Sequence, residues 1–256
     1  MALPGELALG HRPLPQTRNL PLPISAFRFS MFLLIPYEVR TLIQRSPWAN
    51  LGIMAVTIVA SLLSFFGVWT DAAYDHFILT RDFDLAIIGH MFMHAGWLHL
   101  IGNMLMLFVF GNAICGAMSG WLYTTAYFGL GFFAGLAHLA IDNSPVVGAS
   151  GAVYGILGIY LAVYPLNRIN CFWFFLIRAG VTGFPGWLLI LCWFALDVLG
   201  VLGKESGVAH WAHIGGLVGG FALGVVLLRL GKIDIYDYDN PTVLDLLPNK
   251  STPSAG

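Results

Sequence analysis

Residues 148–154 read Gly148-Ala-Ser150-Gly151-Ala-Val-Tyr154, and they open an apolar stretch that continues to about Tyr164. A helix that crosses the hydrocarbon core of a bilayer needs about 20 mostly apolar residues, so this stretch is short for a full span. The preceding residues 143–149 begin Asn-Ser-Pro and are predicted to be non-helical. Irregular backbone at membrane depth is tolerated only where protein buries it or where it lines a wet cavity. The stretch therefore predicts a short helix that begins beside a site inside a membrane protein.

The composition supports a polytopic membrane protein. Apolar residues make up 58% of the 256 residues and charged residues only 10%, whereas soluble domains carry about 25% charged residues. The net charge of -1 gives no indication of nucleic-acid binding. The three cysteines, Cys115, Cys171 and Cys192, have neither metal-ligand spacing nor the pattern of a disulfide framework. We interpret them as small apolar residues and expect no metal or organic cofactor.

Six apolar segments are candidate membrane spans, which predicts an all-α, six-helix bundle over residues 47–231. The segments run from about Trp48 to Val68, Trp97 to Met118, Leu122 to Ile141, Ser150 to Tyr164, Gly186 to Leu202 and Val208 to Leu230. Residues 1–46 are expected to form a cytoplasmic or interfacial segment and residues 232–256 a tail. Met31 to Ile35 and Cys171 to Ile177 are apolar but too short to span. We expect the first to lie on the membrane surface and residues 166–185 to form an interfacial loop.

The positions of lysine and arginine predict the orientation, because cytoplasmic loops carry an excess of these residues. In a six-span model, one side of the membrane carries Arg40, Arg45, Arg168, Arg178, Arg229 and Lys232. The other side is richer in acids. Both termini are therefore expected in the cytoplasm. No cleavable signal peptide is apparent, and the arrangement fits a prokaryotic plasma membrane, with an organelle as the open alternative.

Polar side chains at membrane depth are costly and usually mark function, and here they occur on three of the predicted helices. His99 and Asn103 are four residues apart, so they project from one helical face, as do Ser150 and Tyr154. The sixth segment carries His213. A nucleophilic serine needs a neighbouring base such as this histidine, because the free hydroxyl is a weak nucleophile at neutral pH. Together with the free N–H groups at a helix start, His99 and Asn103 are candidate donors to an oxyanion.

Small residues let membrane helices approach closely, and two glycine stripes are suited to bringing the serine and the histidine together. The fourth segment carries Gly151, Gly155 and Gly158, and the sixth carries Gly216 and Gly220. Taken singly, each feature has an ordinary structural explanation: a serine at a helix start is usually an N-cap, and glycine stripes usually serve packing. We expect structural or interfacial roles for His90, His94, His138 and His210. The functional hypothesis depends on the three motifs occurring together.

The motifs resemble those of the rhomboid family over residues 92–230. His94-xxxx-His99-xxx-Asn103 is similar to the family's second-helix signature, Gly148-Ala-Ser150-Gly151 to its GxSG nucleophile motif, and Ala212-His213-xx-Gly216-xxx-Gly220 to its sixth-helix pattern. The soluble G-x-S-x-G elbow differs, since it requires a strand before the serine. Many members of the family carry Trp-Arg just upstream of the second-helix motif, where this chain has Leu85-Ala86. That departure concerns the first loop and leaves the serine and the histidine untouched.

The resemblance implies an intramembrane serine endopeptidase that hydrolyses peptide bonds in or near the transmembrane segments of other proteins. It implies that Ser150 is the nucleophile and His213 the base, as a dyad without a carboxylate. It also implies that His99, Asn103 and the Ser150 N–H stabilise the oxyanion, and that Tyr154 packs against the His213 ring. Gly148 supports the nucleophile motif. Residues 70–91 would form the membrane-associated first loop, and His94 would have a structural role in that loop.

Two other functions remain as alternatives. A rhomboid-like protein that binds membrane clients without cutting them would be expected to lack the serine or the histidine, and both are present. A transporter or proton channel would show paired ionisable groups and often internal repeats. No repeat is evident, and Asp197, near the end of the fifth segment, is the one acid within the predicted spans. Substrate identity and oligomeric state are not readable from the sequence.

Overall fold

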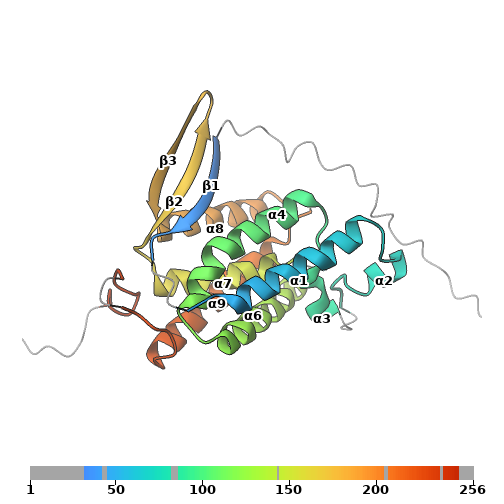
Figure 1. The fold of residues 1–256 in the computed structure, drawn as a ribbon. Helices are drawn as coiled ribbons and strands as arrows, with labels where there is room; N and C mark the ends of the chain where they lie inside the picture. Colours follow the sequence, from blue (N-terminus) through green and yellow to red (C-terminus); the bar gives the residue numbers. More distant parts are fainter. Residues whose placement is uncertain are drawn as a thin grey trace, which may run out of the picture.

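The computed structural model describes residues 32–41, 45–81, 86–142, 144–204, 207–236 and 239–247. It is a bundle of helices with a small sheet projecting from one end (Figure 1). The expectations for residues 1–31, Leu85 and the end of the tail from 248 lie outside the described residues. The helices are α1 (Trp48–Phe65), α2 (Asp71–Asp75), α3 (Ala86–Gly89), η3 (His90–Phe92), α4 (Trp97–Met106), η4 (Leu107–Gly111), α5 (Asn112–Gly116), α6 (Gly120–Ile141), α7 (Ser150–Val163), α8 (Gly186–Leu202) and α9 (His210–Arg229). The strands are β1 (Phe32–Val39), β2 (Arg168–Phe175) and β3 (Arg178–Pro185).

Four helical segments are long and apolar enough to cross a membrane: α1, the continuous run from α4 to α5, α6 and α9. The helices α7 and α8 are apolar but shorter. This confirms a polytopic helical bundle, and all six segments expected to span are helical. The crossing of the membrane by α7 and α8, and so the count of six spans, stays a prediction.

The helix α7 lies in the middle of the bundle and packs tightly against α9. At their contact, a side chain on Gly216 would overlap the carbonyl oxygen of Gly151. A Cβ on Gly220 would lie 2.9 Å from the Cα of Gly155, closer than real Cβ atoms approach. The backbones of α7 and α9 therefore touch directly, as small residues allow in membrane helices.

A π-helical turn, η4, widens the second span, and Asn50 of α1 satisfies its backbone. The Asn50 side-chain amide donates to the Leu107 carbonyl at 2.8 Å and to Asn112 Oδ1 at 2.9 Å. Its carbonyl oxygen accepts a hydrogen bond of 2.6 Å from the Tyr123 hydroxyl. Asn50 and Tyr123 are fully buried, so this network supplies the partners that buried polar groups require.

The prediction that residues 166–185 form a loop is wrong, whereas their place at the membrane interface stays a prediction. These residues form the antiparallel hairpin β2–β3, and β1 pairs with β2 to complete a three-stranded sheet in the order β1-β2-β3. The residues of β2 are mainly β-branched and aromatic, and such residues favour strands. Their partner β1 precedes them by more than a hundred residues, a distance at which no periodicity could reveal the pairing. At the hairpin tip Ile177 is 95% exposed.

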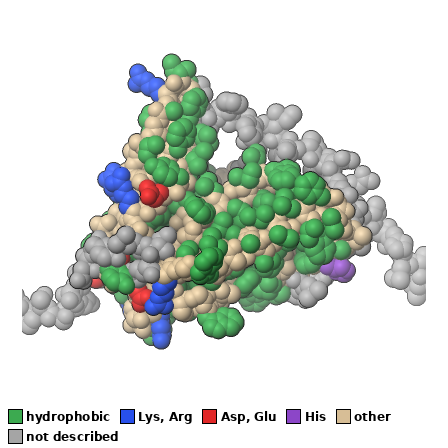
Figure 2. All heavy atoms as spheres, in the orientation of Figure 1, with side chains coloured by type: hydrophobic (Ala, Val, Ile, Leu, Met, Phe, Trp, Pro, Cys, Tyr) green, Lys and Arg blue, Asp and Glu red, His purple; other side chains and the backbone are tan. Residues whose placement is uncertain are grey.

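The segments near both termini meet at the same end of the bundle as the sheet. The Arg40 side chain donates to Asn170 of β2, and Arg45 pairs with Asp234 at 2.6 Å. The described part of the tail packs on the helices, where Val243 N–H donates to the Ala162 carbonyl. Figure 2 shows blue Lys and Arg side chains gathered along this end, whereas the flank of the helices is largely apolar. The basic end is therefore the end at which α7 and α9 finish.

Candidate active site

The helices α4, α7 and α9 begin at the end of the bundle away from the sheet, and the loop before α7 is fixed by backbone pairing. Val146 pairs with Leu79 in an isolated bridge, and the Gly148 N–H donates to the His90 carbonyl at 2.9 Å. Gly148 has φ +123°, a conformation that other residues rarely adopt. A Cβ there would also lie 2.8 Å from His99 Nε2. Glycine is thus required for two reasons, backbone conformation and the close approach of the His99 ring.

Ser150 is the first residue of α7 and is half-buried. The next residue, Gly151, lies against α9: an added Cβ would be 3.6 Å from the Cβ of Ala212, the neighbour of His213. Among the described residues no hydrogen bond joins the Ser150 hydroxyl to His213, whose Nδ1 contacts Asp197. Catalytic hydrogen bonds are often long without substrate and tighten only in the complex.

The His213 ring is held on its face and at its edge. Tyr154, one turn after Ser150 on α7, stacks on it with centroids 4.3 Å apart and an angle of 5° between the planes. At the edge, His213 Nδ1 lies 2.7 Å from Asp197 Oδ1 on α8. The sequence resemblance implied a dyad without a carboxylate, so this contact with a carboxylate is one that the sequence did not predict.

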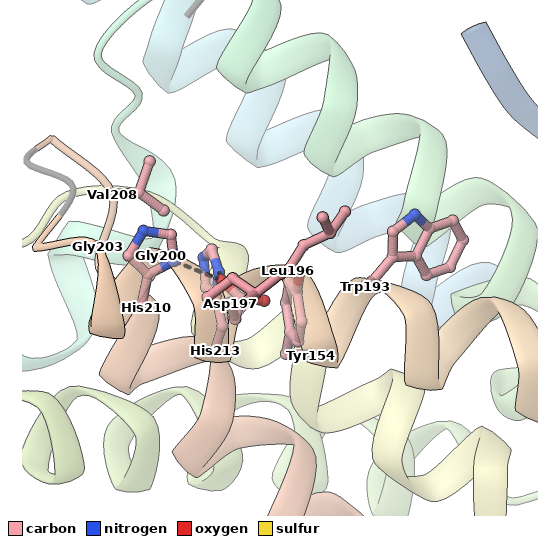
Figure 3. Close-up of a pocket in the computed structure, with 10 residues that line it drawn as sticks. Tyr154, Trp193, Leu196, Asp197, Gly200, Gly203, Val208, His210 and His213 are labelled. Carbon is pink, nitrogen blue, oxygen red and sulfur yellow. Dashed lines mark hydrogen bonds and ion pairs between the residues drawn. The ribbon is translucent and has the colours of Figure 1, made fainter. Parts of the chain in front are cut away.

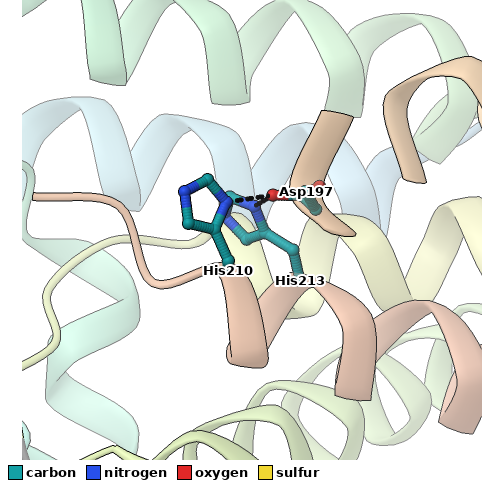
Figure 4. A network of polar contacts seen from close by, with 3 residues as sticks. All are labelled: Asp197, His210 and His213. Atoms are coloured by element: carbon teal, nitrogen blue, oxygen red, sulfur yellow. Dashed lines mark hydrogen bonds and ion pairs between the residues drawn. The ribbon is translucent and has the colours of Figure 1, made fainter. Parts of the chain in front are cut away.

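Asp197 also contacts a second histidine (Figure 4). His210 Nδ1 lies 2.8 Å from the same oxygen, Asp197 Oδ1. Asp197 is 5% exposed and His210 9%. The three side chains offer metal-ligand atoms within 4.8 Å of one another. However, two ligands on a tetrahedral zinc ion with bonds of about 2.0–2.1 Å are about 3.3 Å apart, so separations of 2.7 and 2.8 Å fit hydrogen bonds better.

Beside these residues a cavity of about 670 Å³ opens between α8 and the start of α9 (Figure 3). Its wall includes Tyr154, Asp197, His210 and His213, together with the apolar Trp193 and Leu196. Pockets of this kind, mostly apolar with a few convergent polar groups, are the usual form of a ligand site.

His99 and Asn103 of α4 face the start of α7, where the His94 ring lies beside the His99 ring and between Asn103 and the Ala149 N–H. The Asn103 amide donates to His94 Nε2 at 3.0 Å, and the Ala149 N–H points at the same nitrogen at 3.5 Å. His94 Nδ1 lies 3.0 Å from the Ser61 hydroxyl. Burial, with a smaller contribution from His99, lowers the pKa of His94 to about 3. A neutral His94 therefore accepts from Asn103 and donates to Ser61.

Residues 84–230 match the model of the rhomboid domain, which is more than half of the chain. The chain belongs to the rhomboid family. It is 31% identical over 146 residues to RHOMBOID-like protein 6, mitochondrial, of Arabidopsis thaliana, an alignment that covers 56% of this chain and 43% of that protein. It is 29% identical over 163 residues to Rhomboid protein 1, mitochondrial, of Saccharomyces cerevisiae, covering 58% and 44%. With Rhomboid-type serine protease 2 of Emericella nidulans the identity is 28% over 144 residues, covering 54% and 26%.

This rhomboid chain therefore spans less than half the length of these relatives. The resemblance seen in the sequence extends over the same core as the family match, and membership of the family is confirmed.

The rhomboid site contains two side chains to which sequence reasoning gave no chemistry. Asp197 was noted only as the one acid within the spans, and His210 as structural or interfacial. The available signal was the cost of a buried carboxylate, which requires paired donors. Two histidines, at 210 and 213, stand 13 and 16 residues later, but a spacing across a loop does not show that they converge.

Proposed function

We propose that this protein is an intramembrane serine endopeptidase in which Ser150 is the nucleophile and His213 the general base. Its substrates are the transmembrane segments of other membrane proteins, cut within or near the bilayer. The observation that carries the proposal is the placement of the His213 ring, stacked on Tyr154 of the helix that Ser150 begins. The family, and a relative named as a serine protease, support it.

In the first step, Ser150 Oγ attacks the scissile carbonyl carbon while its proton passes to His213 Nε2. The oxyanion lies near the start of α7, where the Ser150 N–H is available because the first N–H groups of a helix lack intrahelical partners. His99 and the second N–H of the Asn103 amide are the other candidate donors. Collapse of the tetrahedral intermediate breaks the C–N bond, and the proton on His213 goes to the leaving amine.

In the second step, water attacks the acyl-enzyme, His213 takes the water proton and Ser150 leaves as the protonated hydroxyl. The polar groups of His99, Asn103 and His213 offer water the partners that it needs inside an apolar bundle. All groups that react are side chains of this chain and water, so the proposed step needs no added cofactor.

The serine and histidine are tested by Ser150→Ala and His213→Ala, each purified in detergent and incubated with a panel of single-span substrates. Each variant should lose cleavage, and Ser150→Ala should lose labelling by a fluorophosphonate, because both need the serine oxygen. Full activity in either variant would contradict the assignment. A wild-type protein that binds substrates but neither cuts nor takes the label would instead support the client-binding alternative.

The oxyanion donors are tested by Asn103→Ala. Loss of one such donor typically lowers the rate about a hundred- to a thousandfold, and sharing among three donors would reduce that loss. Since Asn103 also donates to His94, the unfolding temperature must be measured alongside the rate. An unchanged turnover number would remove Asn103 from the oxyanion site.

The protein is an integral membrane protein, and we propose that its basic end faces the cytoplasm, with both termini on that side. The contacts of Arg40, Arg45 and Asp234 at the end where α9 finishes support this orientation. The plant and yeast relatives are named mitochondrial, so they lend no support to a prokaryotic plasma membrane. Impermeant maleimide should label Leu247→Cys, in a background without other cysteines, only from the cytoplasmic side.

A further inference from the structure

Asp197 is the only acidic residue within the described membrane helices. It is 5% exposed. A buried carboxylate is strongly destabilising unless it is paired and hydrogen-bonded. Here α9 supplies two imidazole nitrogens to one oxygen, at 2.7 and 2.8 Å. The arrangement therefore joins α8 to the start of α9 through a polar contact inside an apolar bundle.

The shape of α8 is adapted to this contact. Gly200 follows Asp197 by three residues, on the same helical face. An added Cβ at Gly200 would lie 2.9 Å from His210 Cδ2, so a side chain there would displace the His210 ring. With glycine at 200, His210 reaches across α8 to Asp197, and the carboxylate has both donors.

The direction of these hydrogen bonds determines the tautomer of His213. An ionised carboxylate only accepts hydrogen bonds, so Nδ1 of each histidine carries the proton. A neutral imidazole protonated on Nδ1 has its lone pair on Nε2. Nε2 is the atom that must take the proton from Ser150, and the Tyr154 stack keeps the ring in its plane.

We propose that Asp197 is a positioning residue that completes a Ser150–His213–Asp197 triad, with His210 as the second donor that holds the carboxylate in place. This inference rests on the proposed protease function. Asp197 fixes the Nδ1–H tautomer of His213 and, when His213 takes the Ser150 proton, lies beside the resulting imidazolium. Asp197 stays ionised throughout, as the carboxylate does in soluble serine proteases.

The proposal is tested by measuring kcat and KM of the Asp197→Asn variant. The full chain is purified in detergent and given a single-span substrate. An asparagine can donate to His213 Nδ1 and so favour the wrong tautomer. We expect kcat to fall between about a hundredfold and ten-thousandfold, the upper figure being that of the corresponding change in a soluble triad, while KM changes by less than about threefold. Asp197→Glu restores the charge and should recover at least about tenfold of the lost kcat.

Two variants separate catalysis from packing. Leu191→Ala changes the same helix at a side chain that is 45% exposed and outside the cavity, and should keep kcat within about twofold. His210→Asn should lower kcat less than Asp197→Asn does, because it removes only the second donor. A folded Asp197→Asn protein with wild-type kcat, or a larger loss in His210→Asn, would overturn the proposal.

If Asp197→Asn fails to fold, the tautomer of His213 can be measured in the wild-type protein by nitrogen-15 NMR with labelled histidine. The resonances of His213, assigned by their absence in His213→Ala, should show a protonated Nδ1 and an unprotonated Nε2. The opposite tautomer would refute the role of Asp197. If a chelator abolished activity and added Zn²⁺ restored it, the three side chains would be metal ligands, and the proposed role of Asp197 would be refuted.

The outcome for Asp197 is distinct from that for the protease itself. If Ser150→Ala cleaves as well as wild type, the proposed function fails. If wild type cleaves, Ser150→Ala does not, and Asp197→Asn equals wild type, then the protease stands and only the triad is lost.

Discussion

The helices α7 and α8 are both short and apolar, yet α7 is buried in the centre of the bundle and α8 is largely exposed at its periphery. In α7, 11 of 14 residues are buried, whereas in α8 only 5 of 17 are. The helix α7 is enclosed by α6 and α9 through glycine contacts, as Gly155 against Gly220 illustrates. The exposed face of α8 carries large apolar side chains suited to lipid, such as Leu191 and Leu196.

This difference divides the site between a central helix and a peripheral one. Ser150 and Tyr154 stand on α7, whose surroundings hold it from all sides. Asp197 stands on α8, and its contact with His213 depends on α8 staying against the start of α9. If the proposed protease function holds, the central helix α7 would hold the nucleophile in place, and the peripheral helix α8 would stand where a substrate segment could enter beside the cavity.

The largest expected effect is at the α7–α9 contact. Gly220→Val places a branched side chain where even a Cβ would overlap Gly155. Overpacking typically costs about 1–3 kcal/mol, and more where backbone lies in the way, so we expect at least about 3 kcal/mol and little folded protein. Thermal unfolding in detergent measures it. Gly129→Ala on α6, where nothing lies within 4 Å of the added atom, is the matched control and should be neutral.

The next effect compares one leucine from each helix. Leu157 of α7 is 1% exposed and Leu191 of α8 is 45% exposed. Leu157→Ala should destabilise the protein by about 2–5 kcal/mol, because it leaves a cavity, whereas Leu191→Ala should cost under about 1 kcal/mol. Equal losses in the unfolding free energy would show that α8 is packed as firmly as α7.

The sequence predicted those features of the fold that depend on a local pattern of residues. Hydrophobic length identified the helical segments, and the small-residue stripes of Gly151 and Gly216 predicted that α7 and α9 meet. It failed where contacts are non-local. The pairing of β1 with β2, and the convergence of Asp197 with His213, join segments whose spacing in the chain says nothing of distance. A buried polar residue in the sequence indicates that it has hydrogen-bond partners, but it does not identify which residues they are.

The third effect concerns local opening. Regions with few buried contacts open at lower free energy, so amides of α8 should exchange hydrogen at least about tenfold faster than those of α7. Exchange measured by mass spectrometry in detergent would show it, with peptides covering residues 187–202 and 151–163. Similar protection in the two helices would mean that the polar contact of Asp197 holds α8 as firmly as glycine packing holds α7.

The smallest effect is at the start of α7, where His94 faces the Ala149 N–H. Burial lowers the pKa of His94 to about 3 from an ordinary value of 6.5. Above pH 6.5 His94 is neutral in both the folded and the unfolded protein, and its contribution to stability is complete. As the pH falls below 6.5, the unfolded protein takes up a proton that the folded protein does not, so stability is lost.

His94→Gln removes that titration while keeping an amide that can accept from Asn103 and donate to Ser61. Between pH 7.5 and 5.5 the unfolding temperature of wild type should therefore fall by a few degrees more than that of the variant. Other acidic groups titrate in both proteins, so only the difference between the two curves reports His94. Parallel curves would mean that His94 takes up its proton as readily in the folded protein as in the unfolded one. The start of α7 would then be held without a neutral His94, and the central helix would be less firmly fixed at Ser150 than its glycine contacts with α9 suggest.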